Sequence, residues 1–268
     1  MTQKTLVTSP RVTPDANILM ETAKSVGQPV IRLPTFRPPD SLQGVPIVVY
    51  SEALFAIILT AKLNHVVIEP TSDWLVRLPQ AYTQRPIVKT TLSEAWGFES
   101  PRFIKNADGM KAFEAKVYAS GLELPTREFY PDDYEVLVSE PVIWEVEYRC
   151  FIHERALTTM SIYLRHGELA RTADGIWLDE VDETHQAREF CQTLLEDSNV
   201  ALPPACVIDV GRIAERGWAV IEANPAFGSG IYGCDPKEVL RVVNRATLHA
   251  KDVSEADAPW VTKYEIED

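Results

Sequence analysis

The sequence predicts a mixed α/β and α+β fold, in which a small open α/β lobe precedes a larger portion rich in strands. Within about the first 70 residues, short apolar runs alternate with helical patterns, as in the strand–helix–strand units of a mostly parallel sheet. From residue 134 onward, β-rich runs instead follow one another with short polar turns between them. The chain has 268 residues, of which 46% are hydrophobic, and this is enough for the core of one large domain or of two to three lobes.

The first lobe contains four short apolar runs that we expect to be strands: residues 4–8, 29–34, 46–52 and 65–70. Two helical patterns, residues 15–25 and 52–63, lie between them. Asp15 is a plausible N-cap of the first helix, and Gly27 is a plausible stop signal. Right-handed crossovers would join these strands into one small open sheet of parallel character.

The middle of the chain reads as a second, separate lobe. Residues 74–82 begin as a helix that breaks at Pro79, and Ser93 resembles the N-cap of a short helical turn. An apolar strand then ends at Lys105, before a polar turn. A lysine ammonium on a long stem beside such a turn is well placed to reach a phosphate, although a lone lysine is more often a solvated surface residue.

The most informative stretch runs from residue 203 to 233. Two apolar runs, 206–210 and 218–223, flank a short turn and predict a hairpin. Each run carries one carboxylate, Asp209 and Glu222, and Asn224 lies two residues after Glu222 and therefore on the same face of its strand. Two neighbouring buried carboxylates need a compensating cation, and Mg²⁺ prefers such oxygen ligands. The alternative is that these residues are only a strand cap and a polar strand exit.

An Asp on one strand, Glu-x-Asn on the next and a small-residue loop after it resemble the metal-binding end of the ATP-grasp superfamily, whose members mostly join a carboxylate to an amine. In particular, the chain resembles a group of short bacterial and phage-borne members. This resemblance implies an ATP-grasp fold, in which two α+β lobes clasp ATP. We expect an N-terminal α/β domain, the first and second ATP-grasp lobes and an acidic, loosely packed tail, at residues 1–85, 86–143, 144–250 and 251–268.

The resemblance also implies roles for individual residues. Asp209, Glu222 and Asn224 would bind Mg²⁺, for which Mn²⁺ can substitute. Lys89 and Lys105 would contact the α- and β-phosphates of ATP. The loop after Lys105, with a single glycine at Gly109, would cover the phosphates; the next residue is Asn106, where many relatives have proline.

Two β-rich runs lie on either side of Glu140-Pro141, and Pro141 marks a sheet edge or a hinge because it cannot donate a ladder hydrogen bond. By the resemblance, the adenine would lie along the hinge residues Glu140, Pro141, Val142 and Ile143. Glu147 would bind the ribose, and Glu145 competes for this role. In a regular strand Glu145, Glu147 and Arg149 share one face, so they could instead form a solvated salt-bridge ladder.

Several arginines could meet the γ-phosphate, because a planar guanidinium can grip phosphate oxygens through two bonds. Arg165 is the preferred candidate, and Arg149 and Arg171 are alternatives. Relatives often have an arginine two residues before the metal Asp, where this chain has Val207, so Arg212 would have to substitute for it.

Substrate contacts are expected after the second strand of the hairpin. Ser229 and Gly230, in the small-residue loop, are the candidates. The acylphosphate expected from the resemblance hydrolyses readily, so a lid that excludes water is needed, and residues 165–180 are its candidate.

The net charge of −13 and the pI near 4.9 argue against a nucleic-acid-binding surface. The four cysteines lack CxxC spacing, so neither a zinc site nor a disulfide framework is indicated, and reduced thiols fit the cytoplasm. No signal pattern and no apolar run of about 18 residues is present, which predicts neither secretion nor membrane spanning. The P-loop and dinucleotide glycine motifs are also missing from the sequence.

The sequence and the resemblance therefore predict a cytoplasmic, ATP- and Mg-dependent ligase that joins a carboxylate to an amine through an acylphosphate. Its substrates would be small molecules or peptides, and a homodimer is compatible with the sequence. Two alternatives stay open: a phosphotransferase that leaves phosphate on its acceptor, and a non-catalytic nucleotide-binding module.

Overall fold

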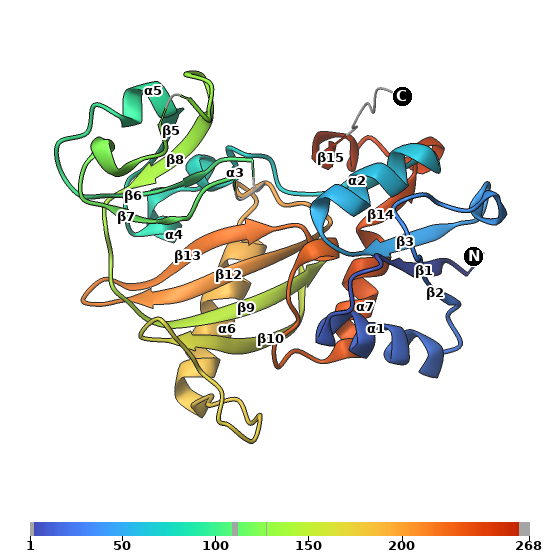
Figure 1. Ribbon diagram of the computed structural model, residues 1–268. Coiled ribbons are helices and arrows are strands. Elements are labelled where there is room, and N and C mark those ends of the chain that lie inside the picture. Colours follow the sequence, from blue (N-terminus) through green and yellow to red (C-terminus); the bar gives the residue numbers. More distant parts are fainter. Residues whose placement is uncertain (1–2, 109–111, 127, 263–268) are drawn as a thin grey trace.

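A computed structural model describes residues 3–108, 112–126 and 128–262. Figure 1 shows three parts: an N-terminal lobe, a small lobe with an antiparallel sheet, and a long twisted sheet that lies between them. Five short 3₁₀ turns are found in the described part, Asp40–Leu42, Gly121–Glu123, Ala226–Gly228, Ala250–Asp252 and Ala258–Trp260. Gly109 lies outside the described residues.

The N-terminal lobe contains a parallel sheet in the order β2-β1-β3, with β1 at Thr5–Thr8, β2 at Val30–Arg32 and β3 at Ile47–Tyr50. Helix α1 (Pro14–Ser25) packs on one face together with α7 (Pro236–Arg245), and α2 (Ala53–Lys62) packs on the other. The open α/β lobe is therefore confirmed. The N-cap of α1 is Thr13, which accepts a hydrogen bond from the amide of Ala16, and not Asp15 as expected.

The fourth expected strand does not join this parallel sheet. Strand β4 (His65–Ile68) pairs antiparallel with β14 (Thr247–His249) and with β15 (Val261–Thr262). The described part of residues 251–268 is therefore not a loosely packed tail. Its Trp260 is buried, so the segment is held by apolar packing as well as by strand pairing.

The next lobe begins with two short helices, α3 (Trp74–Arg77) and α4 (Gln80–Thr83), which are separated at Pro79 as predicted. Its antiparallel sheet has the order β5-β8-β6-β7, and helix α5 follows β5 with Thr91, rather than Ser93, as its N-cap. The bounds are Ile87–Thr91 for β5, Leu92–Ala95 for α5, Arg102–Asn106 for β6, Lys116–Tyr118 for β7 and Glu135–Ser139 for β8.

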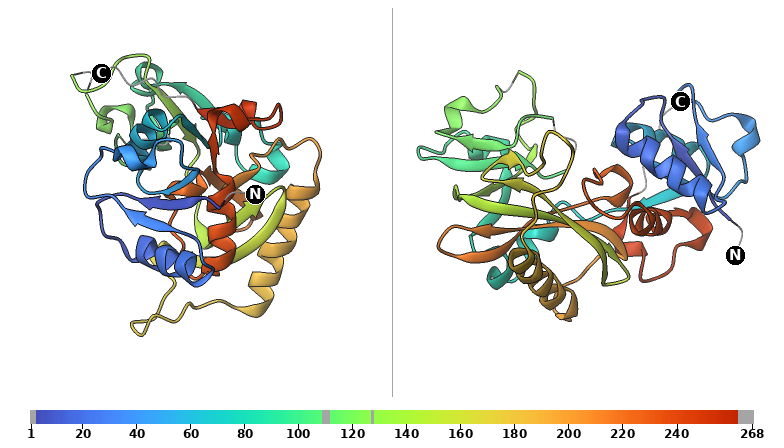
Figure 2. Two further views of the ribbon diagram at one scale, coloured as in Figure 1. Left: turned by 90° about the vertical axis from the view of Figure 1, so that its right-hand side faces the viewer. Right: turned by 90° about the horizontal axis from the view of Figure 1, so that it is seen from below.

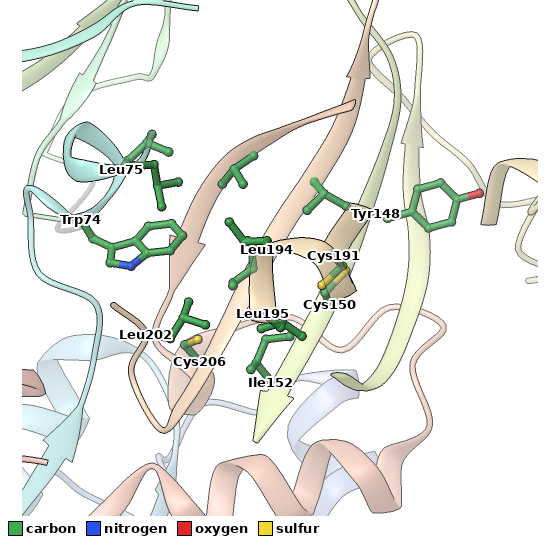
Figure 3. Close-up of a cluster of buried hydrophobic side chains, with 14 of the residues drawn as sticks. Trp74, Leu75, Tyr148, Cys150, Ile152, Cys191, Leu194, Leu195, Leu202 and Cys206 are labelled. Atoms are coloured by element: carbon green, nitrogen blue, oxygen red, sulfur yellow. The ribbon is translucent and has the colours of Figure 1, made fainter. Parts of the chain in front are cut away.

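The large sheet has the order β11-β10-β9-β12-β13 and includes the predicted hairpin. Its strands span Trp144–His153 (β9), Ala156–Arg165 (β10), Glu168–Leu169 (β11), Ala205–Ile213 (β12) and Gly217–Asn224 (β13). Helix α6 (Val181–Glu196) packs on the face turned away from the smaller antiparallel lobe. Figure 3 shows this core, with Cys191 of α6 beside Cys150 of β9.

The opposite face of the large sheet, which we call the cleft face, is turned toward the smaller antiparallel lobe. The four cysteines are buried and unpaired. Over the described ranges, no helix has both the length and the apolar character needed to cross a membrane.

Candidate active site

Three charged side chains form one row across the cleft face. Asp209 on β12 is the cross-strand partner of Arg149 on β9 and of Glu222 on β13. The neighbours of Asp209, Ile208 and Val210, point the other way into the core under α6, because successive residues of a strand alternate between faces. Asp209 is fully buried, and the Arg149 guanidinium grips it through Nε to Oδ1 at 3.0 Å and Nη2 to Oδ2 at 2.7 Å.

Lys105 reaches this row from the other lobe. Its Nζ lies 2.6 Å from Oε2 of Glu222, so this ion pair bridges the two lobes. Lys89 and Lys105 both pair with Leu137 of β8, one from each side, and therefore share a face of the smaller sheet. Lys89 is bound to Glu135 at 2.8 Å and donates to Ser72 at 3.1 Å.

Asn224 completes the cluster, because its Nδ2 donates to Oε1 of Glu222 at 2.8 Å and to Oδ2 of Asp209 at 3.3 Å. The three residues predicted to bind a metal thus converge. Within the described ranges no group of three or more His, Cys, Asp or Glu side chains could hold a metal ion. Two carboxylates and one amide oxygen nevertheless suit Mg²⁺, which takes few protein ligands and completes its shell with water and phosphate oxygens.

Burial and charge shift the carboxylates of the row in opposite directions. Burial raises the pKa of Asp209, although Arg149 opposes this effect. Burial would also raise the pKa of Glu222, but the charge of Lys105 and the hydrogen bonds from Asn224 and Lys105 outweigh it and lower that pKa to about 2. Glu222 is therefore ionised at any physiological pH.

An apolar cavity of about 300 Å³ lies between the smaller sheet and β13. Lys105 and Glu222 stand at its lining, as do the hinge residues Glu140 and Val142. Apolar side chains make up most of the remaining wall, among them Ile87, Phe103, Leu137, Trp144 and Ile221. A flat aromatic group would fit between these walls, since ligand sites combine apolar surfaces with a few polar groups.

The predicted hinge residues do not all face this cavity. Glu140 forms an ion pair with Arg216 at 2.5 Å, which lowers the pKa of Glu140. Pro141 is exposed, and the side chain of Ile143 is 70% exposed. The carbonyl of Ile143 accepts a hydrogen bond from the amide of Ala214 at 3.0 Å, so this oxygen already has a partner.

Glu147 lies on the cleft face between the hinge and Arg149. It is buried and accepts a hydrogen bond from the hydroxyl of Tyr163 at 2.6 Å, and burial raises its pKa. Glu145 instead turns to Arg212, with 2.6 Å between Oε2 and Nε, at an irregularity in the pairing of β9 with β12. The salt-bridge ladder of Glu145, Glu147 and Arg149 is therefore not formed.

Two of the predicted catalytic arginines lie on the opposite face. Arg165 and Arg212 are both cross-strand partners of Val146, whose side chain is buried under α6. Cross-strand partners share a face, so both guanidinium groups point toward α6. There they bind Glu183, at 2.6 Å from Arg165 and 3.0 Å from Arg212. They do not join the Asp209 row, and Arg149 is the predicted arginine that does.

Arg171 also lies apart from the row. Its guanidinium stacks on Trp177 within residues 165–180, with 5.2 Å between Cζ and the ring centroid, and Nε donates to the carbonyl of Gly175.

The small-residue loop brings the N-terminal lobe to Arg149. The carbonyl of Gly230 accepts from Nη1 of Arg149 at 3.1 Å. A Cβ atom on Gly230 would lie 3.4 Å from Oδ2 of Asp15 and 3.5 Å from Nη1 of Arg149, so two opposite charges flank this glycine. Ser229 is buried, and its hydroxyl donates within the loop to the carbonyl of Pro225.

Sequence reasoning missed the aromatic residues around Arg149. The guanidinium carbon lies 4.8 Å from the ring centroid of Tyr232 and 5.4 Å from that of Tyr163, and these two rings stack on each other. Trp177 packs edge-on against Tyr232. Tyr232 could have been noticed because it stands between glycines of the loop, where its φ is +46°. Nothing in the local sequence marks Tyr163, since strand register brings it to the site.

Comparison with known proteins agrees with this geometry. Residues 82–242 match the model of a protein family described as an ATP-grasp domain, family 2 of its clade. No curated protein matches the sequence closely enough to count as a relative.

Several solved ATP-grasp structures are similar to this chain. N5-carboxyaminoimidazole synthetase from Staphylococcus aureus has a TM-score of 0.52 at 14% identity, over 90% of this chain and 77% of its own. A RimK domain ATP-grasp protein from Sphaerobacter thermophilus has 0.51 at 12%, over 90% and 98%. The ATP-grasp ligase PsnB with a minimal precursor has 0.51 at 11%, over 91% and 99%. Such low identities show the fold alone, and they confirm the ATP-grasp prediction.

The family match spans the smaller antiparallel lobe and the large sheet with its row of charged residues, and it covers more than half of the chain. The chain therefore belongs to this family of ATP-grasp domains.

Proposed function

We propose that this protein is an ATP- and Mg-dependent ligase that joins a carboxylate to an amine. One observation carries the proposal: Lys105, Glu222, Asn224, Asp209 and Arg149 meet beside an apolar cavity between two lobes. This arrangement offers an apolar slot for a base, oxygen ligands for a cation and cations for phosphates. Membership of the ATP-grasp family supports the same conclusion.

The nucleotide would lie along β9. Its adenine fits the apolar cavity beside Val142 and Trp144, and the ribose would come next, where Glu147 can accept hydrogen bonds from its hydroxyls. The phosphates would then reach Lys105 and Arg149. The order of these residues along the strand supports this direction, because Trp144, Glu147 and Arg149 follow one another from the hinge toward the N-terminal lobe.

Asp209, Glu222 and Asn224 would hold Mg²⁺, and Mn²⁺ would suit the same oxygen ligands. The ion would supply neutralisation of the charge on the phosphates. Arg149 would steady the transferring phosphoryl group, because its guanidinium is held by stacking on Tyr232 and by the carbonyl of Gly230.

In the reaction, a carboxylate oxygen of the first substrate would form a bond to the γ-phosphorus of ATP, and the bond to the bridging oxygen of ADP would break. The amine nitrogen of the second substrate would then attack the acyl carbon, releasing phosphate and losing its proton. The N-terminal lobe meets Arg149 at Gly230, so we place the acid and the amine, small molecules or peptides, on that side.

The test is release of ADP and phosphate from MgATP with panels of acids and amines. Activity should require both substrates and should disappear in Glu222→Gln, whereas Lys116→Gln should keep it, because Lys116 pairs with the exposed Glu114. Mass spectrometry of the product should show an amide. A product that carries a phosphoryl group and no amide would instead identify a phosphotransferase, and nucleotide binding without turnover would identify a binding module.

A further inference from the structure

We propose that Lys105 and Arg149 are exchangeable counter-ions: they neutralise the two carboxylates of the metal site in the free protein, and they pass to the phosphates when metal and nucleotide bind together. The inference rests on the proposed function and deepens it, because it says how the same site is kept closed to either ligand alone.

The hydrogen bonds of the cluster are the basis for this inference. Every carboxylate oxygen of Asp209 and Glu222 accepts a bond from a donor of the chain itself. Lys105 and Asn224 bind Oε2 and Oε1 of Glu222, at 2.6 and 2.8 Å. Arg149 binds both oxygens of Asp209, at 3.0 and 2.7 Å, and Asn224 adds a longer bond to Oδ2. A metal ligand must present these lone pairs to the ion, so the donors stand where an ion would have to bind.

The charges of the cluster also balance, since two carboxylates face one ammonium and one guanidinium. A free divalent ion would have to displace both cations, and these would be left without partners beside a double positive charge. The Arg149 side chain is only 9% exposed, so water could compensate little of this cost.

ATP without a metal meets the reverse problem. Its phosphates would draw Lys105 and Arg149 away from the row, and Asp209 and Glu222 would then be left unpaired against a polyanion. When both ligands arrive together, the carboxylates bind the ion and the two cations bind phosphates, so every charge keeps a partner. The predicted result is strong positive coupling between metal and nucleotide, which thermodynamics requires to be reciprocal.

Coupling alone would not distinguish this arrangement, because ATP chelates divalent ions in any case. The specific signature is a gain of binding for one ligand when the opposing partner is removed. A variant that merely misfolds cannot produce such a gain.

The first measurement uses Mn²⁺ alone, followed by its electron paramagnetic resonance signal, with Lys105→Met. Removing the ammonium frees Glu222, so Mn²⁺ should bind at least about tenfold more tightly than to the wild type. Lys89→Met is the matched control, because its ammonium is held 2.8 Å from Glu135 and not by the row. It should show no gain, and the double variant Lys105→Met with Glu222→Gln should lose the gain.

The second measurement uses ATP alone, titrated by calorimetry in excess EDTA, with Glu222→Gln. The neutral amide holds Lys105 less strongly, so ATP without metal should bind about three- to tenfold more tightly than to the wild type. With Mg²⁺ present, the same variant should bind ATP more weakly than the wild type, because it lacks one metal ligand.

The outcomes separate the two proposals. If wild-type protein binds ATP with Mg²⁺ but neither variant gains affinity for its single ligand, the exchange of counter-ions is refuted and the ligase proposal stands. If wild-type protein does not bind ATP even with Mg²⁺, the proposed function itself is refuted. Both gains, with a silent Lys89→Met, would establish the exchange.

Discussion

The two faces of the large sheet carry similar residues in different arrangements. Under α6, Glu183 binds Arg165 and Arg212, and the side chains of these arginines are 26% and 34% exposed. On the cleft face, Asp209 is fully buried with Arg149. The first cluster joins a helix to the sheet it covers, whereas the second is continued by Lys105 into another lobe. The comparison teaches that an arginine–carboxylate pair becomes a candidate site through the face it occupies.

Removing one carboxylate from each face should give the largest contrast. Asp209→Ala should weaken MgATP binding at least about 100-fold, because a metal ligand is lost. It should also lower the free energy of unfolding by about 3–5 kcal/mol, because Arg149 is left buried and unpaired. Glu183→Ala should lower that free energy by about 1–3 kcal/mol and leave MgATP affinity within about twofold. Calorimetry and urea unfolding measure both quantities, and equal loss of binding in the two variants would contradict the distinction between the faces.

The next contrast replaces one arginine on each face by methionine. Arg149→Met should weaken MgATP binding about 10- to 100-fold, because charge-assisted hydrogen bonds to phosphate are lost. Arg165→Met should leave it unchanged within about twofold, since its partners are Glu180 and Glu183. Arg149→Lys should fall between wild type and Arg149→Met, as a lysine keeps the charge but not the two-pronged grip. A strong effect of Arg165→Met on affinity would restore the role first expected for it.

The sequence could not separate Arg149 from Arg165, and the reason is physical. Alternation along one strand fixes which residues share a face, and it correctly predicted that Glu222 and Asn224 lie together. It does not say which face of that strand is covered by a helix. Arg165 and Arg149 lie on different strands, so only the pairing of β9 with β10 relates them, and this pairing contains two irregularities.

The same limit explains the errors in the fold. The strand and helix patterns of the first lobe were readable because each depends on neighbours in the chain. The partners of β4 were not, since β14 and β15 lie about 180 residues further along the chain and pair with it through the tertiary fold. The contact of Lys105 with Glu222 spans 117 positions in the same way. A family resemblance could suggest that both residues belong to one site, but local patterns could not.

A smaller contrast concerns the aromatic rings that stack on the arginines. Tyr232→Ala should weaken MgATP binding about three- to tenfold, because Arg149 loses a cation–π contact at 4.8 Å that orients it. Tyr232→Phe should bind nearly as well as wild type, since it keeps the ring. On the other face, Trp218→Ala removes the ring beside Arg212 and should leave affinity unchanged. Titration of the three variants with MgATP would decide this, and equal losses in Phe and Ala would assign the effect to the hydroxyl instead.

The smallest expected effect separates two glutamates of β9 through the pH dependence of stability. Burial raises the pKa of Glu147 above its value in the unfolded chain, so the folded state holds this proton more tightly. As the pH rises through the unfolded and then the folded value, ionisation therefore costs stability. Glu147→Gln, which cannot ionise, should raise the melting temperature by about 2–4 °C at pH 7, and the difference should vanish below about pH 4. Glu145→Gln should bring no such gain, because it removes the partner of Arg212. If Glu147→Gln instead melted lower at pH 7, its hydrogen bond with Tyr163 would outweigh the cost of the buried charge, and the carboxylate on the cleft face would be as much a structural residue as those under α6.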